Sequence, residues 1–152
     1  MIEAAQYKTA SYVVRLGNAV TNYRNVKMQE YGLTSAQGDT MRAILHAPGI
    51  TAAELKKQLG LSQSTVAGIL ARLEQKGLLE KKLVDGDARK MSLCPTPQGL
   101  ELEATLKQTA LDTQNRMTNG MTSEEQAEFD RLLSKALANL AAAREKRGTP
   151  HE

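Results

Sequence analysis

The sequence is poor in residues on which several classes of protein depend. Cys94 is the only cysteine, which excludes an intrachain disulfide. Tryptophan is absent and there is one phenylalanine, so the apolar side chains are mostly aliphatic, which suits helix-on-helix packing better than a β-sandwich. No run approaches the roughly 18 apolar residues of a membrane helix, and no charged lead followed by an apolar run opens the chain. We therefore expect a cytoplasmic protein with no membrane partner.

Residues that support catalysis or metal binding are also scarce. The two histidines, His46 and His151, stand far apart in the sequence, and with Cys94 they cannot form a local zinc set. Cys94 has no histidine nearby in the sequence to activate it as a nucleophile. The sequence therefore predicts no enzyme, no metal and no cofactor, and we interpret Cys94 as a small buried residue rather than a redox sensor.

The chain does contain enough apolar residues for one domain. Its 152 residues are 41% hydrophobic, which is sufficient for a core of ordinary size. The net charge of +3 is a weak argument for a polyanionic partner, but the charges are unevenly distributed. Residues 51–95 carry eight basic and five acidic side chains, whereas residues 96–152 carry seven and nine. Positive charge is concentrated in the middle of the chain.

Periodicity and capping residues divide most of the chain into helices. The first is long, with apolar residues from Tyr12 to Val26, and ends before Gly32. The starts of the other five are marked by Thr34 with Gln37, Thr51 with Glu54, Ser62, Thr96-Pro97, and Ser123 with Gln126. After Gly77, apolar and polar residues alternate on both sides of Asp85-Gly86-Asp87, which indicates a β-hairpin.

The order helix, turn, helix, hairpin predicts the fold class, which is mainly α with a small β-hairpin wing. We expect one domain over residues 1–152. Residues 34–95 form a winged helix-turn-helix, which we call the reader lobe. Long helices within residues 1–33 and 96–147 form a dimerisation region, and residues 148–152 form a flexible tail.

The helix that begins at Ser62 is the candidate for entering a DNA major groove, because this groove admits one helix whose first residues reach the base edges. On a helical wheel, Ser64, Gly68, Ala71 and Gln75 point away from the buried stripe, with Thr65 and Arg72 beside them. The residues expected to contact DNA are Ser62, Gln63, Ser64, Thr65, Gly68 and Arg72. Gln63 suits adenine, and Arg72 suits phosphate. The alternative is that the Ser62–Thr65 segment only caps the helix.

The predicted hairpin is basic. Lys81, Lys82, Arg89 and Lys90 surround a polar tip that can straddle phosphates, and Arg89 is the candidate for insertion into a minor groove. For Lys81 and Lys82 the alternative is a role as edge-strand charges that oppose aggregation. For Asp87 the alternative is an ordinary turn residue beside Gly86.

Four motifs in order resemble the MarR family (multiple antibiotic resistance regulators). They are Ser62-Gln63-Ser64-Thr65-Val66, Leu73-Glu74-Gln75-Lys76-Gly77-Leu78-Leu79, Asp87-Ala88-Arg89 and Thr96-Pro97-Gln98-Gly99. The likeness implies that Arg89 enters the minor groove, that Asp87 holds its guanidinium, and that the first and last two helices form a homodimer. The family often has larger polar residues where this chain has Gly68 and Ala71, so direct base readout is expected to be thin.

The resemblance implies a homodimeric repressor that binds a pseudo-palindromic DNA operator and is released by a small aromatic or phenolic ligand. Long apolar stripes in the terminal helices independently favour a second copy as partner. Tyr12, Arg15 and Tyr23 are candidates for the ligand pocket, although we favour dimer packing with a snorkelling arginine for these three. The competing hypothesis is a winged-helix accessory or architectural protein with nonspecific contacts to DNA or protein.

Overall fold

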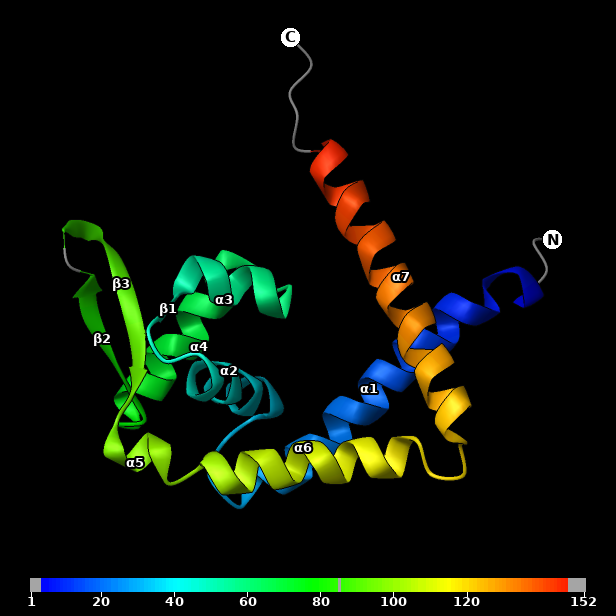
Figure 1. Cartoon of the computed structure of the whole chain (residues 1–152), viewed down its shortest axis with the longest axis horizontal. Coiled ribbons are helices and arrows are strands. Elements are labelled where there is room, and N and C mark those ends of the chain that lie inside the picture. Colours follow the sequence, from blue (N-terminus) through cyan, green and yellow to red (C-terminus); the bar gives the residue numbers. More distant parts are fainter. Residues whose placement is uncertain (1–3, 85, 148–152) are drawn as a thin grey trace, which may run out of the picture. The chain divides into compact units, whose positions relative to one another are not determined.

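The computed structural model describes residues 4–84 and 86–147, and it is mainly helical with one small sheet (Figure 1). The chain forms two compact units, one ending at residue 113 and one beginning at residue 114, which are described separately. The helices are η1 (Ala4–Tyr7), α1 (Lys8–Gln29), α2 (Ser35–His46), α3 (Ala52–Leu59), α4 (Gln63–Gln75), α5 (Pro97–Leu100), α6 (Glu103–Met117) and α7 (Ser123–Arg147). The predicted fold class is confirmed. Within the described ranges, no helix has the length and apolar character needed to span a membrane.

The helices of the reader lobe begin at the predicted caps. The Oγ1 atoms of Thr34 and Thr51 each accept a hydrogen bond from the backbone three residues on, and the side chains of Gln37 and Glu54 complete both capping boxes. α3 ends at Gly60, whose φ of 65° is the left-handed conformation that glycine adopts without strain. This glycine allows the sharp turn from α3 into α4.

The sheet has three antiparallel strands in the order β1-β3-β2, in which β1 is Ile50–Thr51, β2 is Leu79–Val84 and β3 is Asp87–Pro95. The prediction of a two-stranded hairpin was therefore incomplete. β1 pairs with β3 through Ile50 opposite Leu93, and the N–H of Gly49 donates to the carbonyl of Leu93 at 2.8 Å. A strand of two residues has no periodicity of its own, so it forms only because tertiary structure brings β3 beside it.

The core lies within the first unit and joins the reader lobe to α1 and α6. Its buried apolar side chains are Met28, Leu33, Met41, Ala43, Ile44, Ile50, Leu55, Val66, Leu70, Leu73, Leu78, Leu79, Leu93 and Leu106. α2, α3 and α4 surround one part of this core, and the sheet closes it (Figure 1). The recognition candidate α4 is thereby held by its buried stripe, and its opposite face is exposed.

The prediction of one continuous helix from Thr96 was wrong. α5 ends at Leu100 and α6 begins at Glu103. The short α5 is attached to the base of the sheet, because the N–H of Thr96 donates to the carbonyl of Leu78 at 3.1 Å and the Thr96 hydroxyl donates to the carbonyl of Gly77 at 2.5 Å. These tertiary bonds fix the direction of α5, and the chain turns at residues 101–102 before α6.

The predicted cap of α7 is off by one residue. In the second unit, the Thr122 Oγ1 accepts from the Glu125 N–H at 3.1 Å, and the Glu125 carboxylate accepts from the Thr122 N–H at 2.9 Å. The predicted pair, Ser123 with Gln126, has the same spacing one position later. A carboxylate is the stronger acceptor at a helix N-terminus, so the Thr122 pair forms the capping box.

Candidate nucleic-acid interface

Three of the N-terminal residues of α4 form hydrogen bonds that cap the helix, and Gln63 between them is available to contact a partner. The Ser62 Oγ accepts from the Thr65 N–H at 3.2 Å and lies 2.7 Å from the Thr65 Oγ1 and 3.3 Å from the Ser64 Oγ. These three hydroxyls form a local network, so the predicted capping role is present. Gln63 is exposed, and among the described residues none forms a hydrogen bond with its side chain. Its amide is available to donate to and accept from a base edge.

The exposed face of α4 is formed mostly by small side chains. Ser64, Gly68, Ala71 and Gln75 are exposed, as the helical wheel predicts, and Arg72 is exposed beside them. A Cβ at Gly68 would meet no atom within 4 Å. Glycine is therefore not required there by the packing of the chain itself.

The wing carries the predicted lysines on its strands. Lys81 and Lys82 lie on β2 and Lys90 lies on β3, and all three are exposed. The Lys82 Nζ lies 3.2 Å from a carboxylate oxygen of Glu80, in an exposed pair of small energetic value. The backbones of Asp87, Ala88 and Arg89 belong to β3, but the side chains of Asp87 and Arg89 lie outside the described residues. Their predicted roles stay predictions.

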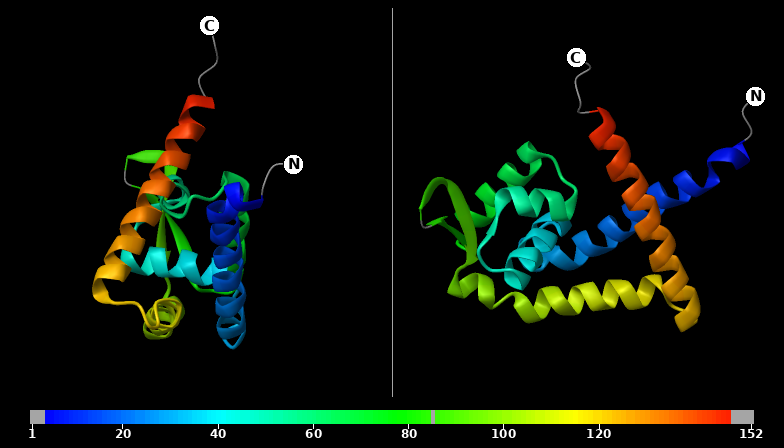
Figure 2. Two further views of the ribbon diagram at one scale, coloured as in Figure 1. Left: turned by 90° about the vertical axis from the view of Figure 1, so that its right-hand side faces the viewer. Right: turned by 45° about the horizontal axis from the view of Figure 1, so that its top comes forward.

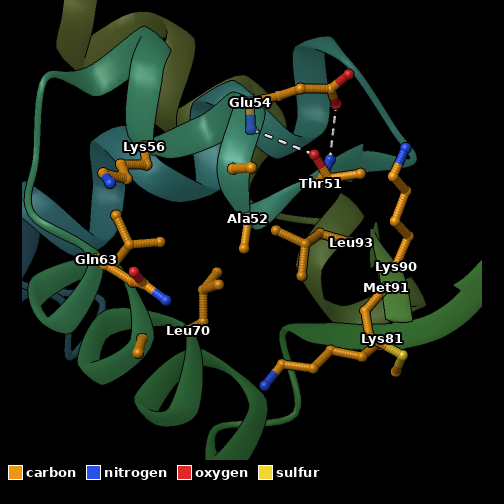
Figure 3. A pocket seen from close by; sticks show the side chains of 13 residues that line it. Thr51, Ala52, Glu54, Lys56, Gln63, Leu70, Lys81, Lys90, Met91 and Leu93 are labelled. Atoms are coloured by element: carbon orange, nitrogen blue, oxygen red, sulfur yellow. Dashed lines mark hydrogen bonds between the residues drawn. The ribbon is translucent and has the colours of Figure 1, made fainter. Parts of the chain in front are cut away.

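A cavity of about 670 Å³ lies between α3, α4 and the sheet (Figure 3). Val66, Leu70 and Leu93 contribute to its apolar lining. Gln63 and Lys56 lie on one side of it, and Lys81 and Met91 lie on the other (Figure 3). The cavity thus connects the start of α4 with the wing. The sequence-based prediction of the site did not include Lys56. This lysine is exposed on α3, the helix that precedes α4, as the wing lysines are on their strands.

The electrostatic balance of this cavity is positive. Among the residues whose side chains are described, Lys56, Lys81 and Lys90 line it, and Glu54 is the acidic residue of its lining. The backbone N–H of Thr51 donates to the Glu54 carboxylate and holds the pKa of Glu54 below its usual value. Glu54 is therefore ionised at neutral pH, and the three cations and one anion of this described lining favour a negatively charged partner.

The three predicted ligand-pocket residues lie along α1 but do not all meet. The Arg15 guanidinium lies 5.8 Å from the centre of the Tyr12 ring, and the Lys8 ammonium lies 5.6 Å from it. The half-buried Tyr23 donates a hydrogen bond to Asp112 of α6. Tyr23 is eleven residues after Tyr12, which is about 16 Å along a helix. Tyr12 and Arg15 are thus together and Tyr23 is apart, and a ligand pocket here stays a prediction.

Comparisons with known proteins agree with this architecture. The sequence model of the MarR family matches residues 31–90. The chain is 29% identical over 105 residues to the transcriptional regulator HosA of Escherichia coli, covering 69% of this chain and 78% of HosA. A MarR protein from Peptoclostridium difficile has a similar structure, with a TM-score of 0.89, 25% identity and coverage of 96% of this chain and 95% of that one. A putative MarR family regulator from Listeria monocytogenes, solved with a 26mer DNA, has a TM-score of 0.86 at 21% identity, covering 94% and 97%.

Proposed function

We propose that the chain, which is similar to transcriptional regulators of the MarR family, is a homodimeric repressor of a pseudo-palindromic DNA operator and not an enzyme. A small aromatic or phenolic ligand releases it. One observation carries the proposal: the exposed Gln63 and two lysines of the wing, Lys81 and Lys90, border the same cavity between α4 and the sheet. The similar Listeria protein was solved with DNA, which supports a duplex as the partner.

In this proposal α4 enters the major groove and the wing follows the backbone. Gln63 pairs with the N6 and N7 groups of an adenine, and Arg72, Lys81, Lys82 and Lys90 contact phosphates. Ser62, Ser64 and Thr65 combine capping with contacts to the DNA backbone. Asp87 and Arg89 act at the wing tip, where Arg89 enters the adjacent minor groove.

Direct base readout is thin, because the exposed face of α4 presents Gly68 and Ala71 where polar side chains could reach bases. These positions bring the helix backbone close to the groove without supplying a hydrogen bond. Specificity then depends more on DNA shape, on phosphate positioning and on the distance between half-sites than on many base contacts.

The terminal helices supply the dimer surface. On α1, Tyr12, Val13 and Val14 are 53%, 49% and 62% exposed. On α7, Leu137 and Leu140 are 70% and 69% exposed. Apolar side chains exposed to this extent along long helices favour burial against a second copy, and two-fold symmetry then makes the operator an inverted repeat.

Ligand release follows from the same arrangement. A ligand that binds one arrangement of the two reader lobes more tightly changes their spacing, and the operator is released. Arg15 beside Tyr12 can pair with a ligand carboxylate against an aromatic ring. Because these side chains are exposed on α1, packing against the second copy competes with this role.

The test is selection of bound sequences from a random duplex pool at fixed, near-physiological salt. We expect enrichment of an inverted repeat with half-sites about one helical turn apart. Gln63→Ala should relax one base per half-site by about five- to 150-fold, which corresponds to a lost bidentate contact. Gln75→Ala removes the same side chain from the other end of α4 and is the matched control, so its motif should be unchanged.

Arg89→Ala tests the wing in the same assay, and its enrichment should weaken at positions flanking the half-sites. If no motif is recovered from the unmodified chain, and binding is weak and unchanged in both variants, the repressor proposal is wrong. That result would favour the accessory or architectural protein.

A further inference from the structure

Helix α1 is attached to the rest of the first unit only near its C-terminal end. Between Lys8 and Asn22 every side chain is exposed except those of Leu16 and Val20, which are half-buried. Met28, by contrast, is fully buried in the core. The N-terminal part of α1 extends away from the reader lobe (Figure 2). The direction of this exposed part is therefore set by a few contacts in the last two turns.

One of these contacts is a two-point ion pair between α1 and α2. The Arg24 Nη1 donates to the Asp39 Oδ2 at 2.8 Å, and the Arg24 Nη2 contacts the Asp39 Oδ1. A guanidinium that meets both oxygens of a carboxylate fixes the angle as well as the distance between two side chains. Asp39 lies in the second turn of α2, so the pair orients α1 relative to the first helix of the reader lobe.

Two further contacts complete this joint. The Asn25 Oδ1 accepts a hydrogen bond from the backbone N–H of Ser35 at 2.8 Å, which caps the first turn of α2. Met28 packs against Gly38, where an added Cβ would lie 2.8 Å from the methionine sulfur. Asn25 and Met28 fix how closely the helices approach, whereas the planar pair of Arg24 with Asp39 adds a preferred direction.

The burial of this pair indicates that it contributes direction more than stability. The side chains of Arg24 and Asp39 are 14% and 29% exposed, so both have lost most of their hydration. The Arg24 Nε and the Asp39 Oδ1 are buried, and no described residue forms a hydrogen bond with either atom, although the Arg24 Nη2 contacts this oxygen as an ion pair. A partly buried pair with one donor and one acceptor that lack hydrogen bonds gains little net stability over an apolar pair of the same size, although it still specifies one geometry.

We propose that Arg24 is a positioning residue whose pair with Asp39 sets the spacing between the two DNA half-sites. The inference rests on the proposed function. In the homodimer, the exposed part of α1 packs against the second copy and α2 belongs to the lobe that reads DNA. The α1–α2 joint therefore lies between the dimer contact and the DNA contact. A change of angle at this joint moves the two reader lobes apart or together.

The experiment uses the full chain and a set of duplexes built from the selected half-sites, with the spacer changed one base pair at a time. The double variant Arg24→Met with Asp39→Leu replaces the pair by apolar side chains of similar size. This change preserves the packing and removes the contact that fixes the angle between α1 and α2. Arg24→Lys keeps the charge but loses the two-point geometry. Arg42→Met is the matched control, because Arg42 also contacts Asp39, at 3.8 Å, from a side chain that is 52% exposed.

We expect the unmodified chain and Arg42→Met to prefer the best spacer over its neighbours by about fivefold or more, a typical coupling between sites. The double variant should compress this preference to less than about twofold while keeping the same half-site motif and a similar midpoint of thermal unfolding. The spacer preference of Arg24→Lys should lie between that of the unmodified chain and that of the double variant. Loss of stability alone would weaken binding to every spacer equally, so the preference separates positioning from folding.

An unchanged spacer preference in the folded double variant overturns the inference and leaves the proposed function standing. If the double variant does not fold, Arg24→Lys decides, and a preference equal to that of the unmodified chain overturns the inference. Failure of the unmodified chain to select any inverted repeat overturns the proposed function itself, and the inference with it.

Discussion

Gly99 occupies a position where the fold leaves no room for a side chain. A Cβ built on it would lie 2.1 Å from the carbonyl oxygen of Leu78 and 3.2 Å from the Met41 Cε. Carbon and oxygen atoms in contact lie about 3.3 Å or more apart, so Gly99→Ala requires a shift of about 1.2 Å. The methionine can move its end, but the Leu78 carbonyl is backbone and already accepts the N–H of Thr96 at 3.1 Å. The substitution must therefore displace α5 or the start of β2.

The expected loss can be worked out from these contacts. Breaking the bond between Thr96 and Leu78 costs about 1 kcal/mol, and forcing a methyl group into a packed site costs about 1–3 kcal/mol. The free energy of unfolding should therefore fall by about 3 kcal/mol. For a chain of this length, that is a decrease of about 6–12 °C in the midpoint of thermal unfolding.

Gly68→Ala is the matched control, because a Cβ there meets nothing within 4 Å and the residue lies in the interior of a helix. It should raise the free energy of unfolding by up to about 1 kcal/mol. Both variants are measured by urea unfolding at equal protein concentration, since dimerisation makes stability depend on concentration. If the urea midpoint of Gly99→Ala equals that of the unmodified chain within error, the steric reasoning is refuted.

The remaining predictions concern a cap, the terminal surface and the wing. Thr51→Ala removes the N-cap of α3 and should lower the free energy of unfolding by about 1 kcal/mol in urea titrations, whereas no change would exclude a capping contribution. The bond from the Thr51 N–H lowers the pKa of Glu54, so its stabilisation is complete above the unfolded pKa near 4.5 and is lost as the pH falls through the lower folded value. The decline of stability below that pH should accordingly be shallower in Glu54→Gln, and equal declines would contradict the assignment. Leu137→Glu places a charge on an exposed apolar position of α7 and should yield monomers in analytical ultracentrifugation, whereas an unchanged dimer would exclude this position from the interface. Lys81→Ala removes one phosphate contact from each subunit of the dimer and should reduce the magnitude of the slope of log affinity against log salt by about 1.8, whereas Lys107→Ala on α6 should leave the slope unchanged.

Much of the fold could be predicted because its signals are local. Thr34 with Gln37 and Thr51 with Glu54 form the expected capping boxes, since each requires only residues three positions apart. The buried stripe of α4 follows helical spacing for the same reason. For the site, the exposure of Gln63, Lys81 and Lys90 could be predicted from their local sequence, whereas the position of these three residues around one cavity could not.

Two of the errors involve contacts between distant residues. β1 is two residues long and exists through its pairing with Leu93, and the start of α5 is attached to the sheet by bonds from Thr96 to Leu78 and Gly77. Neither partner is near in the sequence, so no local pattern encodes the outcome. The cap of α7 differs, because two overlapping patterns of equal spacing competed and the one that ends in Glu125 forms.

The sequence by itself determined the helices and caps of the reader lobe, the hairpin and the exposed face of α4, because these depend on spacing along one helix or strand. Tertiary structure alone decided which distant residues come together: Lys56, Lys81 and Lys90 around one cavity, Gly99 against the Leu78 carbonyl, and Arg24 with Asp39 between α1 and α2. Periodicity specifies the direction in which a side chain points within its own element. The partner it reaches depends on how the elements pack, and packing is a property of the whole core.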